Sequence, residues 1–121
     1  MTNWRAVFIG FGVEVLLALL AMVAPGIGHA AAGLIGGFVA GYIAGGSLGS
    51  GAWHGLLAGS LGGIVLAIFV AFGVTVLGTV GAGPFGPILG GATFVVALAV
   101  AFLFALDSAI GGLLGAVFSP N

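Results

Sequence analysis

Four long apolar stretches, separated by short segments rich in glycine, proline and serine, dominate the hydrophobic pattern of this 121-residue chain. A bilayer core about 30 Å thick requires roughly 20 apolar residues in helical conformation. The pattern therefore predicts four membrane-spanning helices, at about residues 4–23, 29–45, 53–80 and 91–118. Backbone groups inside lipid must find their hydrogen bonds within the chain, which favours helices over strands.

The interruptions between these stretches differ in strength. Ala24, Pro25 and Gly26 stop the first stretch, since proline disfavours helix in the residue before it. Residues 46–51 combine glycine and serine and predict a short flexible connection. Residues 81–87 carry several glycines and prolines, and predict a longer loop.

Composition supports a membrane protein. Hydrophobic residues make up 62% of the chain and charged residues 2%, whereas water-soluble domains carry about a quarter charged residues. The mean hydropathy is +1.47. We therefore expect a single all-α domain over residues 1–121, an integral membrane bundle of four transmembrane helices with glycine-rich interfaces, in contact with membrane lipid.

Several chemistries are excluded by residue content. The chain has no cysteine, which rules out disulfides and thiolate metal sites. A single Lys or Arg cannot form a nucleic-acid footprint, which needs clustered basic residues. Nucleotide-binding loops, nucleophile elbows and zinc-protease motifs are missing from the sequence, so we expect no enzyme activity and no cofactor.

Arg5 sets the expected orientation. Positive residues favour the cytoplasmic side, so four crossings of the cell membrane place both termini there. Trp4 and Trp53 then lie at the inner boundary, as in an aromatic belt. His29 and His54 fall at opposite membrane ends, and we expect no metal site between them.

Glycines recur at a spacing of four residues, which places them on single helix faces. Such faces let two helices approach closely in lipid. The series are Gly33, Gly37, Gly41 and Gly45 in the second stretch, Gly55, Gly59 and Gly63 in the third, and Gly111 and Gly115 in the fourth. They predict close contact between the second and third helices, or between copies of the protein. The pattern Gly-x-x-Gly-Gly also occurs twice, at residues 33–37 and 59–63, through internal duplication or chance.

Glu14 and Asp107 are the chain's only acidic residues, and both lie inside apolar stretches. A carboxylate in hydrocarbon costs about 2.5 to 3.5 kcal/mol, which makes each acid a candidate functional group. Counted at about 1.5 Å per residue, Glu14 lies roughly 12 Å and Asp107 roughly 10 Å inside the inner boundary. The two acids can thus share one level. The other candidate polar residues in this half of the membrane are Tyr42, His54, Ser60 and Ser108.

Two interpretations of these acids remain open. If they meet, repulsion and desolvation favour a pair that shares a proton, relays protons or binds a cation. Alternatively, each acid is protonated or bonds to backbone, Tyr42, Ser108 or Arg5, and only fixes helix register. The Asp107–Ser108 pair would instead cap a new helical segment if the last stretch breaks near Leu106.

Four segments carry a resemblance to a known group of proteins. They read NWRAV at residues 3–7, PGIGH at 25–29, AGLIGG at 32–37 and LDSA at 106–109. In these four segments and in the order in which they occur, the chain resembles an uncharacterised family of small, glycine-rich, four-helix membrane proteins of halophilic archaea, a domain of unknown function. The resemblance spans nearly the whole chain and implies an archaeal cell membrane, but no activity.

The chain is also similar to small multidrug resistance transporters in length, helix number and a carboxylate midway along the first helix. That likeness implies a proton and substrate site at Glu14. The third helix departs from that family because Trp53 lies at its start rather than its centre, and Asp107 has no counterpart there.

The sequence favours one function over another. The first is a non-enzymatic membrane protein that self-associates through its glycine faces, as a homo-oligomer or as a structural or accessory subunit of a membrane complex. The alternative is a small proton-coupled transporter or ion channel that uses Glu14 and Asp107.

Overall fold

The computed structural model describes residues 1–25 and 27–120. Within them the chain forms α1 (Trp4–Leu20), the 3-10 turn η1 (Ala21–Val23), α2 (Ile27–Ala44), α3 (Leu48–Ala82) and α4 (Phe85–Phe118). The four α-helices, the first taken together with η1, are long and apolar enough to cross a membrane. The prediction of an all-helical protein with four candidate membrane spans is confirmed.

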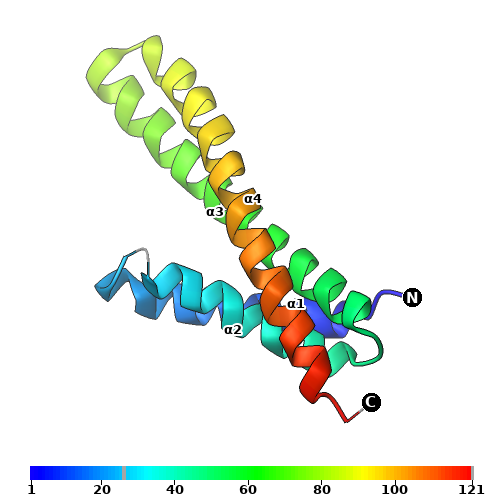
Figure 1. Cartoon of the computed structure of the whole chain (residues 1–121). Coiled ribbons are helices and arrows are strands. Elements are labelled where there is room, and N and C mark those ends of the chain that lie inside the picture. Colours follow the sequence, from blue (N-terminus) through cyan, green and yellow to red (C-terminus); the bar gives the residue numbers. More distant parts are fainter. Residues whose placement is uncertain (26, 121) are drawn as a thin grey trace.

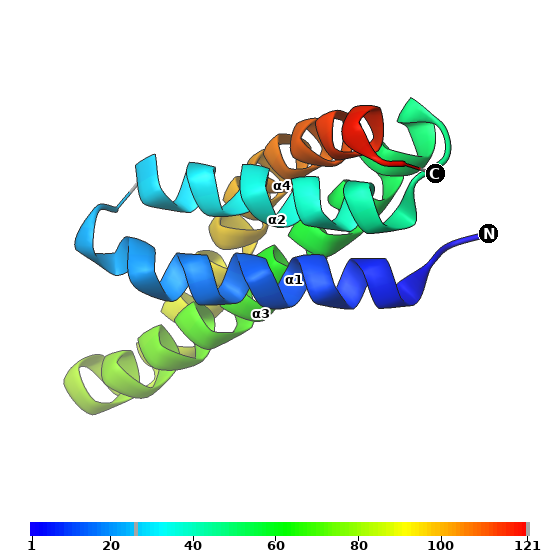
Figure 2. The same cartoon turned by 90° about the horizontal axis from the view of Figure 1, so that it is seen from below.

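The helices form two hairpins that diverge from a shared end (Figure 1). α1 and α2 make one arm and lie side by side (Figures 1 and 2). α3 and α4 make the second, longer arm. Both chain termini and the connection between α2 and α3 lie at the shared end.

The two arms differ greatly in length. α1 and α2 have 17 and 18 residues, whereas α3 and α4 have 35 and 34. At about 1.5 Å per residue the long arm measures about 52 Å, against a bilayer core of about 30 Å. The long arm must therefore incline steeply in the membrane or extend beyond the hydrocarbon core. The angle between the long arm and the short arm fits a steeply inclined long arm (Figure 1).

The predicted flexible connection at residues 46–51 is wrong. Gly45 and Gly46 turn the chain with φ angles of 63° and 80°, which favour glycine. Ser47 then caps α3, because its hydroxyl accepts a hydrogen bond from the Ser50 backbone N–H at 3.1 Å. α3 consequently begins at Leu48, and the glycines that follow are helical.

The predicted loop at residues 81–87 is also wrong. α3 continues to Ala82, and Gly83, with a φ of 60°, makes a tight turn. α4 begins directly after Pro84. Pro87 is accommodated because backbone N–H groups in the first turn have no partner within the helix.

α1 ends earlier than predicted. Asn3 caps its start by accepting a hydrogen bond from the Ala6 backbone N–H at 3.2 Å. After Leu20 the chain tightens into η1 ahead of Pro25. Gly26, which the sequence assigns to this break, lies outside the described residues.

α4 runs without a break through Asp107 and Ser108, so the prediction of a helix cap there is wrong. The Ser108 side chain is fully buried and donates a hydrogen bond to the Gly55 carbonyl of α3 at 2.8 Å. Because the Ser108 hydroxyl bonds the neighbouring helix, it does not cap a new helix start, and α4 continues through this position.

α4 is the common packing partner of α2 and α3. A Cβ atom at Gly37 of α2 or Gly55 of α3 would collide with the backbone carbonyl of Ser108, and one at Gly41 or Gly51 would collide with that of Gly112. Further contacts of this kind between helices are those of Gly33, Gly59 and Gly63 with α4, and those of Gly111 and Gly115 of α4 with α2. Both glycine series therefore meet α4 from two sides within one chain.

This packing refines one prediction and corrects another. The second and third helices contact each other, but their glycines pack most closely against α4. Gly45 does not belong to a packing face, because it follows the end of α2 in the turn described above.

Candidate functional site: an acid pair at the head of a groove

Glu14 lies where α1 meets α2 and α3. A Cβ atom added at Gly36 of α2 would lie 2.6 Å from the Glu14 Cβ, so only glycine permits this approach. On the other side, a Cβ atom at Gly62 of α3 would lie 3.2 Å from Glu14 Oε1. Two glycines from different helices thus make room for one acidic side chain.

Asp107 of α4 reaches α2 at nearly the same level. A Cβ atom at Gly33 would lie 2.9 Å from Asp107 Oδ2. Gly33 and Gly36 are separated by about 4.5 Å along the helix axis, less than one turn. The two carboxyl groups are close enough for their charges to interact. The structure therefore brings both acids to one region.

Each acid holds a buried oxygen without a partner. Glu14 Oε2 and Asp107 Oδ2 have no hydrogen-bond partner in residues 1–25 and 27–120. Bonds from Tyr42, Ser108 or Arg5 to these two atoms are therefore not formed. A buried polar atom without a partner is costly, and in native proteins such atoms are usually explained by a proton, a water, an ion or a ligand.

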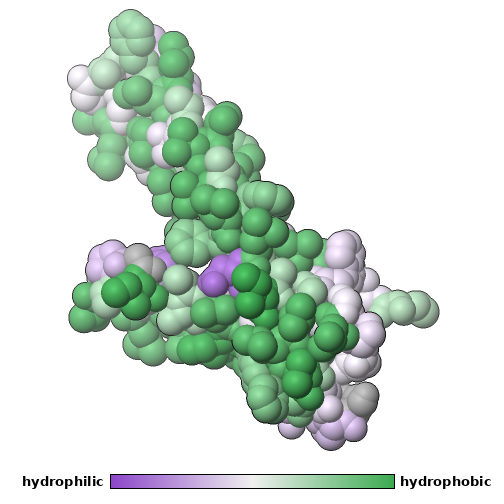
Figure 3. Space-filling model, viewed as in Figure 1, coloured by the Kyte–Doolittle hydropathy of each residue, from purple (hydrophilic) through white to green (hydrophobic). Residues whose placement is uncertain are grey.

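Glu14 also opens onto a groove between the two arms. The groove has a volume of about 880 Å³. It is lined on one side by α1, η1 and α2, and on the other by α3 and α4. Figure 3 shows a hydrophilic patch where the arms diverge, surrounded by hydrophobic surface. Glu14 is therefore not sealed by its neighbours.

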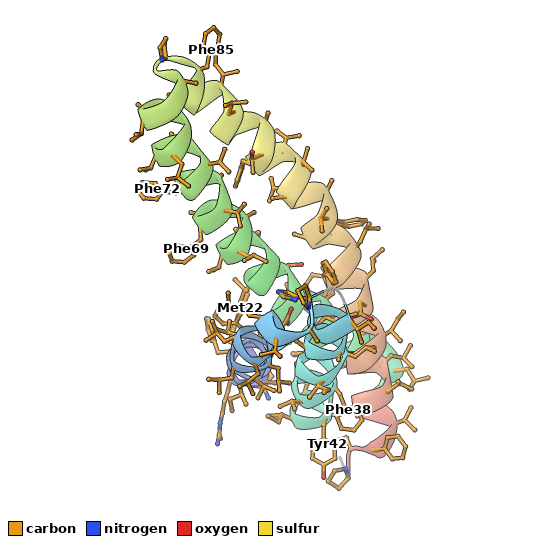
Figure 4. All side chains as sticks on the ribbon, turned by 90° about the vertical axis from the view of Figure 1, so that its left-hand side faces the viewer. Met22, Phe38, Tyr42, Phe69, Phe72 and Phe85 are labelled. Atoms are coloured by element: carbon orange, nitrogen blue, oxygen red, sulfur yellow. The ribbon has the colours of Figure 1, made fainter. Side chains whose placement is uncertain are left out.

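The groove is almost entirely apolar. Its polar side chains within the described residues are Glu14, His29 and Thr93. The Thr93 hydroxyl donates to the Leu89 carbonyl of its own helix at 2.8 Å, so it is already satisfied. Met22 and Phe69, on opposite arms, line the groove and are 71% and 70% exposed (Figure 4). The groove is thus open at the outer surface of the helices, and this surface faces lipid when the protein lies in a membrane.

The repeated Gly-x-x-Gly-Gly pattern has a structural meaning that its spacing alone did not reveal. In both copies the middle glycine, Gly36 or Gly62, faces Glu14. The flanking glycines, spaced by four residues, face α4. In each copy the middle glycine follows the first glycine by three residues instead of four. This offset was the sequence signal that distinguished Gly36 and Gly62 from the glycines that face α4.

Sequence reasoning also missed His29 as a groove residue. It precedes Gly33 by one helical turn on α2 and lines the groove that Glu14 enters. The spacing of four residues from Gly33, combined with a nearby acid, was the available signal. Within the described residues no three His, Cys, Asp or Glu side chains gather in a metal-binding group.

Four of the predicted site residues, Tyr42, Ser60, Ser108 and His54, do not join the two acids. Tyr42 is 41% exposed, stacks on Phe38 (Figure 4), and follows Gly33 by about 14 Å along α2. Ser60 precedes Gly62 by two residues and so projects from a different face of α3. Ser108 is next to Asp107 but is committed to its bond with α3.

His54 joins the start of the chain to α3 instead of the acid pair. Its Nε2 accepts a hydrogen bond from the Asn3 backbone N–H at 2.8 Å. Its Nδ1 lies 2.7 Å from the Ser50 carbonyl, which can only accept, so Nδ1 carries the proton. Nearby, Trp53 Nε1–H donates to the Thr2 hydroxyl at 3.0 Å.

Comparison with known proteins gives one match. Neither curated proteins nor solved structures match the chain. A family model described as a family of unknown function (DUF5518) matches residues 4–118, which is nearly the whole chain. The expectation of an uncharacterised family is confirmed, and the chain belongs to the family of unknown function DUF5518.

Proposed function

We propose that this protein is a small, non-enzymatic, proton-coupled transporter of the cell membrane, with the Glu14–Asp107 pair as its proton site. The observation that carries the proposal is the position of Glu14. Its carboxyl lies near enough to that of Asp107 for their charges to interact, and it also lines the groove between the arms. We infer that both termini lie on the cytoplasmic side, since they share one end of the molecule and Arg5 lies close by.

The pairing suits reversible proton binding. Two carboxyls in an apolar setting repel each other when both are ionised, so the pair favours holding one proton between them. A charged ligand that enters the groove changes how readily the two carboxyls hold this proton. Proton release and ligand binding are then linked through the same two side chains.

A purely structural role for the acids has less support. A carboxyl that fixes helix register does so through hydrogen bonds. Glu14 Oε2 and Asp107 Oδ2 lack such bonds within the described part of the chain. The neighbours that make room for both acids are glycines, which have no side chain that could donate a hydrogen bond.

The test is proton movement across a membrane. Wild-type protein is reconstituted in liposomes that enclose a pH-sensitive dye, and an acid pulse is applied outside. We expect faster dye response than in protein-free liposomes, and loss of that excess in Glu14→Gln and Asp107→Asn. Tyr42→Phe is the matched control because Tyr42 lies apart from the pair. Background response from wild type would exclude proton transport.

A second candidate is a structural or accessory subunit of a membrane assembly, including a homo-oligomer. The outer half of the long arm favours it, because α3 and α4 there extend away from α1 and α2 (Figure 1). The glycine faces are occupied within the chain, so the contact would use other surfaces. Chemical crosslinking in native membranes tests it: a single monomeric species would count against assembly.

A further inference from the structure

One face of α2 brings three ionisable side chains into a row. His29, Gly33 and Gly36 follow one another at spacings of four and three residues, which places them on one side of the helix. His29 contributes its own ring, whereas the two glycines leave room for the side chains of Asp107 and Glu14. The three levels are about 6 Å and then about 4.5 Å apart along the helix axis. Along α2 the row therefore runs from the histidine, through Asp107, to Glu14.

His29 is the outermost member of this row. α2 begins at the end of the short arm that lies opposite to both chain termini (Figure 1), and His29 is its third residue. Its side chain is half-buried and lines the same groove as Glu14. With the termini on the cytoplasmic side, His29 lies between the outer side of the membrane and the acids.

His29 is also the only titratable side chain in the parts of the sequence that extend beyond the acids. Residues 15–41 contain no other, and residues 55–106 contain none. The remaining titratable side chains besides the two acids are Arg5, Tyr42 and His54, which lie toward the shared end of the arms. A proton that reaches the acids from the outer side by way of a side chain must therefore use His29.

We propose that His29 relays protons between the outer side of the membrane and the Glu14–Asp107 site. This inference rests on the proposed function and adds the route by which its proton site is reached. Cβ atoms four residues apart on a helix are separated by about 5–6 Å. Asp107 Oδ2 lies 2.9 Å from the place of a Cβ atom at Gly33, four residues after His29. The imidazole ring and one bridging water span such a gap.

Each relay event conserves protons. The unprotonated ring nitrogen of His29 forms an N–H bond with a proton from the outer water. The other ring nitrogen loses its proton to a carboxylate oxygen of Asp107, where an O–H bond forms. Ring rotation then restores the starting tautomer, and no electron is transferred. The charges of Asp107 and Glu14 interact, so either carboxyl can hold the delivered proton.

A chain of water alone is a poorer route. Water inside a protein needs about two to four polar partners. Besides Glu14 and His29, the only polar side chain in the described lining of the groove is Thr93, whose hydroxyl already bonds the Leu89 carbonyl. An apolar groove thus offers few partners to hold waters in a row. His29 shortens the distance that water has to bridge.

Proton flux into liposomes after an acid pulse tests the relay. Glutamine keeps much of the polarity of histidine but does not exchange a proton near neutral pH. We expect His29→Gln to lower the Glu14-dependent rate at least about tenfold, because a positioned proton-transfer group contributes about 10²- to 10⁴-fold. His54→Gln, the same change at the chain's other histidine, is the matched control and should keep the wild-type rate. An unchanged rate in His29→Gln would overturn the proposal.

Chemical restoration separates a relay from a structural role. Because the chain has no cysteine, His29→Cys introduces a single thiol. Alkylation with a bromomethylimidazole attaches a new imidazole ring at this position, whereas benzyl bromide attaches a ring of similar shape without nitrogen. We expect only the imidazole adduct to recover the flux. Equal rates for the two adducts would overturn the relay, and a folding defect cannot produce a difference between them because both share one polypeptide.

The wild-type rate separates this inference from the proposed function. A rate that depends on Glu14 but not on His29 would refute only the relay. A rate equal to that of protein-free liposomes would refute proton transport itself, and the relay with it. Helical circular dichroism checks that each variant is folded.

Discussion

The Glu14 carboxyl lies so close to Gly62 that a Cβ atom there would sit 3.2 Å from Oε1. Glu14 belongs to the short arm and Gly62 to the long arm, so this contact joins the two hairpins at the head of the groove. A glycine of the long arm therefore lies directly beside the acid of the short arm. The Glu14 carboxyl can occupy this position because Gly62 has no side chain.

Gly62→Ala should change the environment of Glu14 while the fold persists. The added methyl group must displace a flexible carboxyl rather than backbone, so the helices need not separate. We expect a shift in the infrared C=O band assigned to Glu14 by its loss in Glu14→Gln. Gly73→Ala, on the same helix with nothing within 4 Å of the new atom, is the control. Identical spectra for both alanine variants would contradict the contact.

Gly55→Ala should destabilise the protein. The new Cβ atom would collide with the Ser108 backbone carbonyl, which cannot move without shifting α4. Overpacking of this kind costs about 1 to 3 kcal/mol. Thermal unfolding in detergent measures the loss, and Gly91→Ala, which meets nothing within 4 Å, serves for comparison. If both variants unfold at the wild-type temperature, α3 and α4 do not pack as described.

Ser108→Ala should weaken the contact between α3 and α4. The hydroxyl is fully buried and bonds the Gly55 carbonyl across the interface at 2.8 Å. Hydrogen bonds between membrane helices contribute about 0.6 kcal/mol on average and up to about 1.7 kcal/mol. Thr79→Ala removes a hydroxyl that bonds only its own helix, at the Thr75 carbonyl, and should cost less. Equal losses in detergent unfolding would show that the bond across the interface adds nothing.

Loss of the His54 ring should loosen the start of the chain on α3. His54 Nε2 accepts the Asn3 N–H at 2.8 Å, while Nδ1 donates to the Ser50 carbonyl of the same helix. In His54→Phe, which has no ring nitrogen, the Asn3 N–H loses this acceptor. Amide hydrogen exchange at Asn3 reports the change: it should be faster in the variant than in wild type under the same conditions. Equal exchange in both proteins would show that this bond does not hold the start of the chain.

The helices and the level of the acids were accessible from the sequence because both depend on counting residues. Apolar runs predicted four spans, and equal depth along two helices predicted that Glu14 and Asp107 share a level. The connections were less accessible. Ser47 and Pro84 turned glycine-rich segments into helix starts, because a cap or a first-turn position outweighs the weak helix propensity of the residues that follow.

Helix neighbours could not be derived from spacing alone. The glycine series identified faces for close packing, but a face does not specify its partner. α4 became that partner because it presents Ser108 and Gly112 carbonyls to α2 and α3 at once. The groove was likewise not predictable, since it depends on the angle between two arms of unequal length.

The central claim is that Glu14 and Asp107 form one proton site. Proton release during an alkaline titration of purified protein, followed with a pH-indicator dye, tests it in wild type, Glu14→Gln, Asp107→Asn and the double variant. Coupled acids should behave non-additively: each single substitution should shift the pH at which the remaining acid releases its proton, relative to wild type. If the release curve of each single variant equals wild type minus one independent acid, the two residues do not share a site.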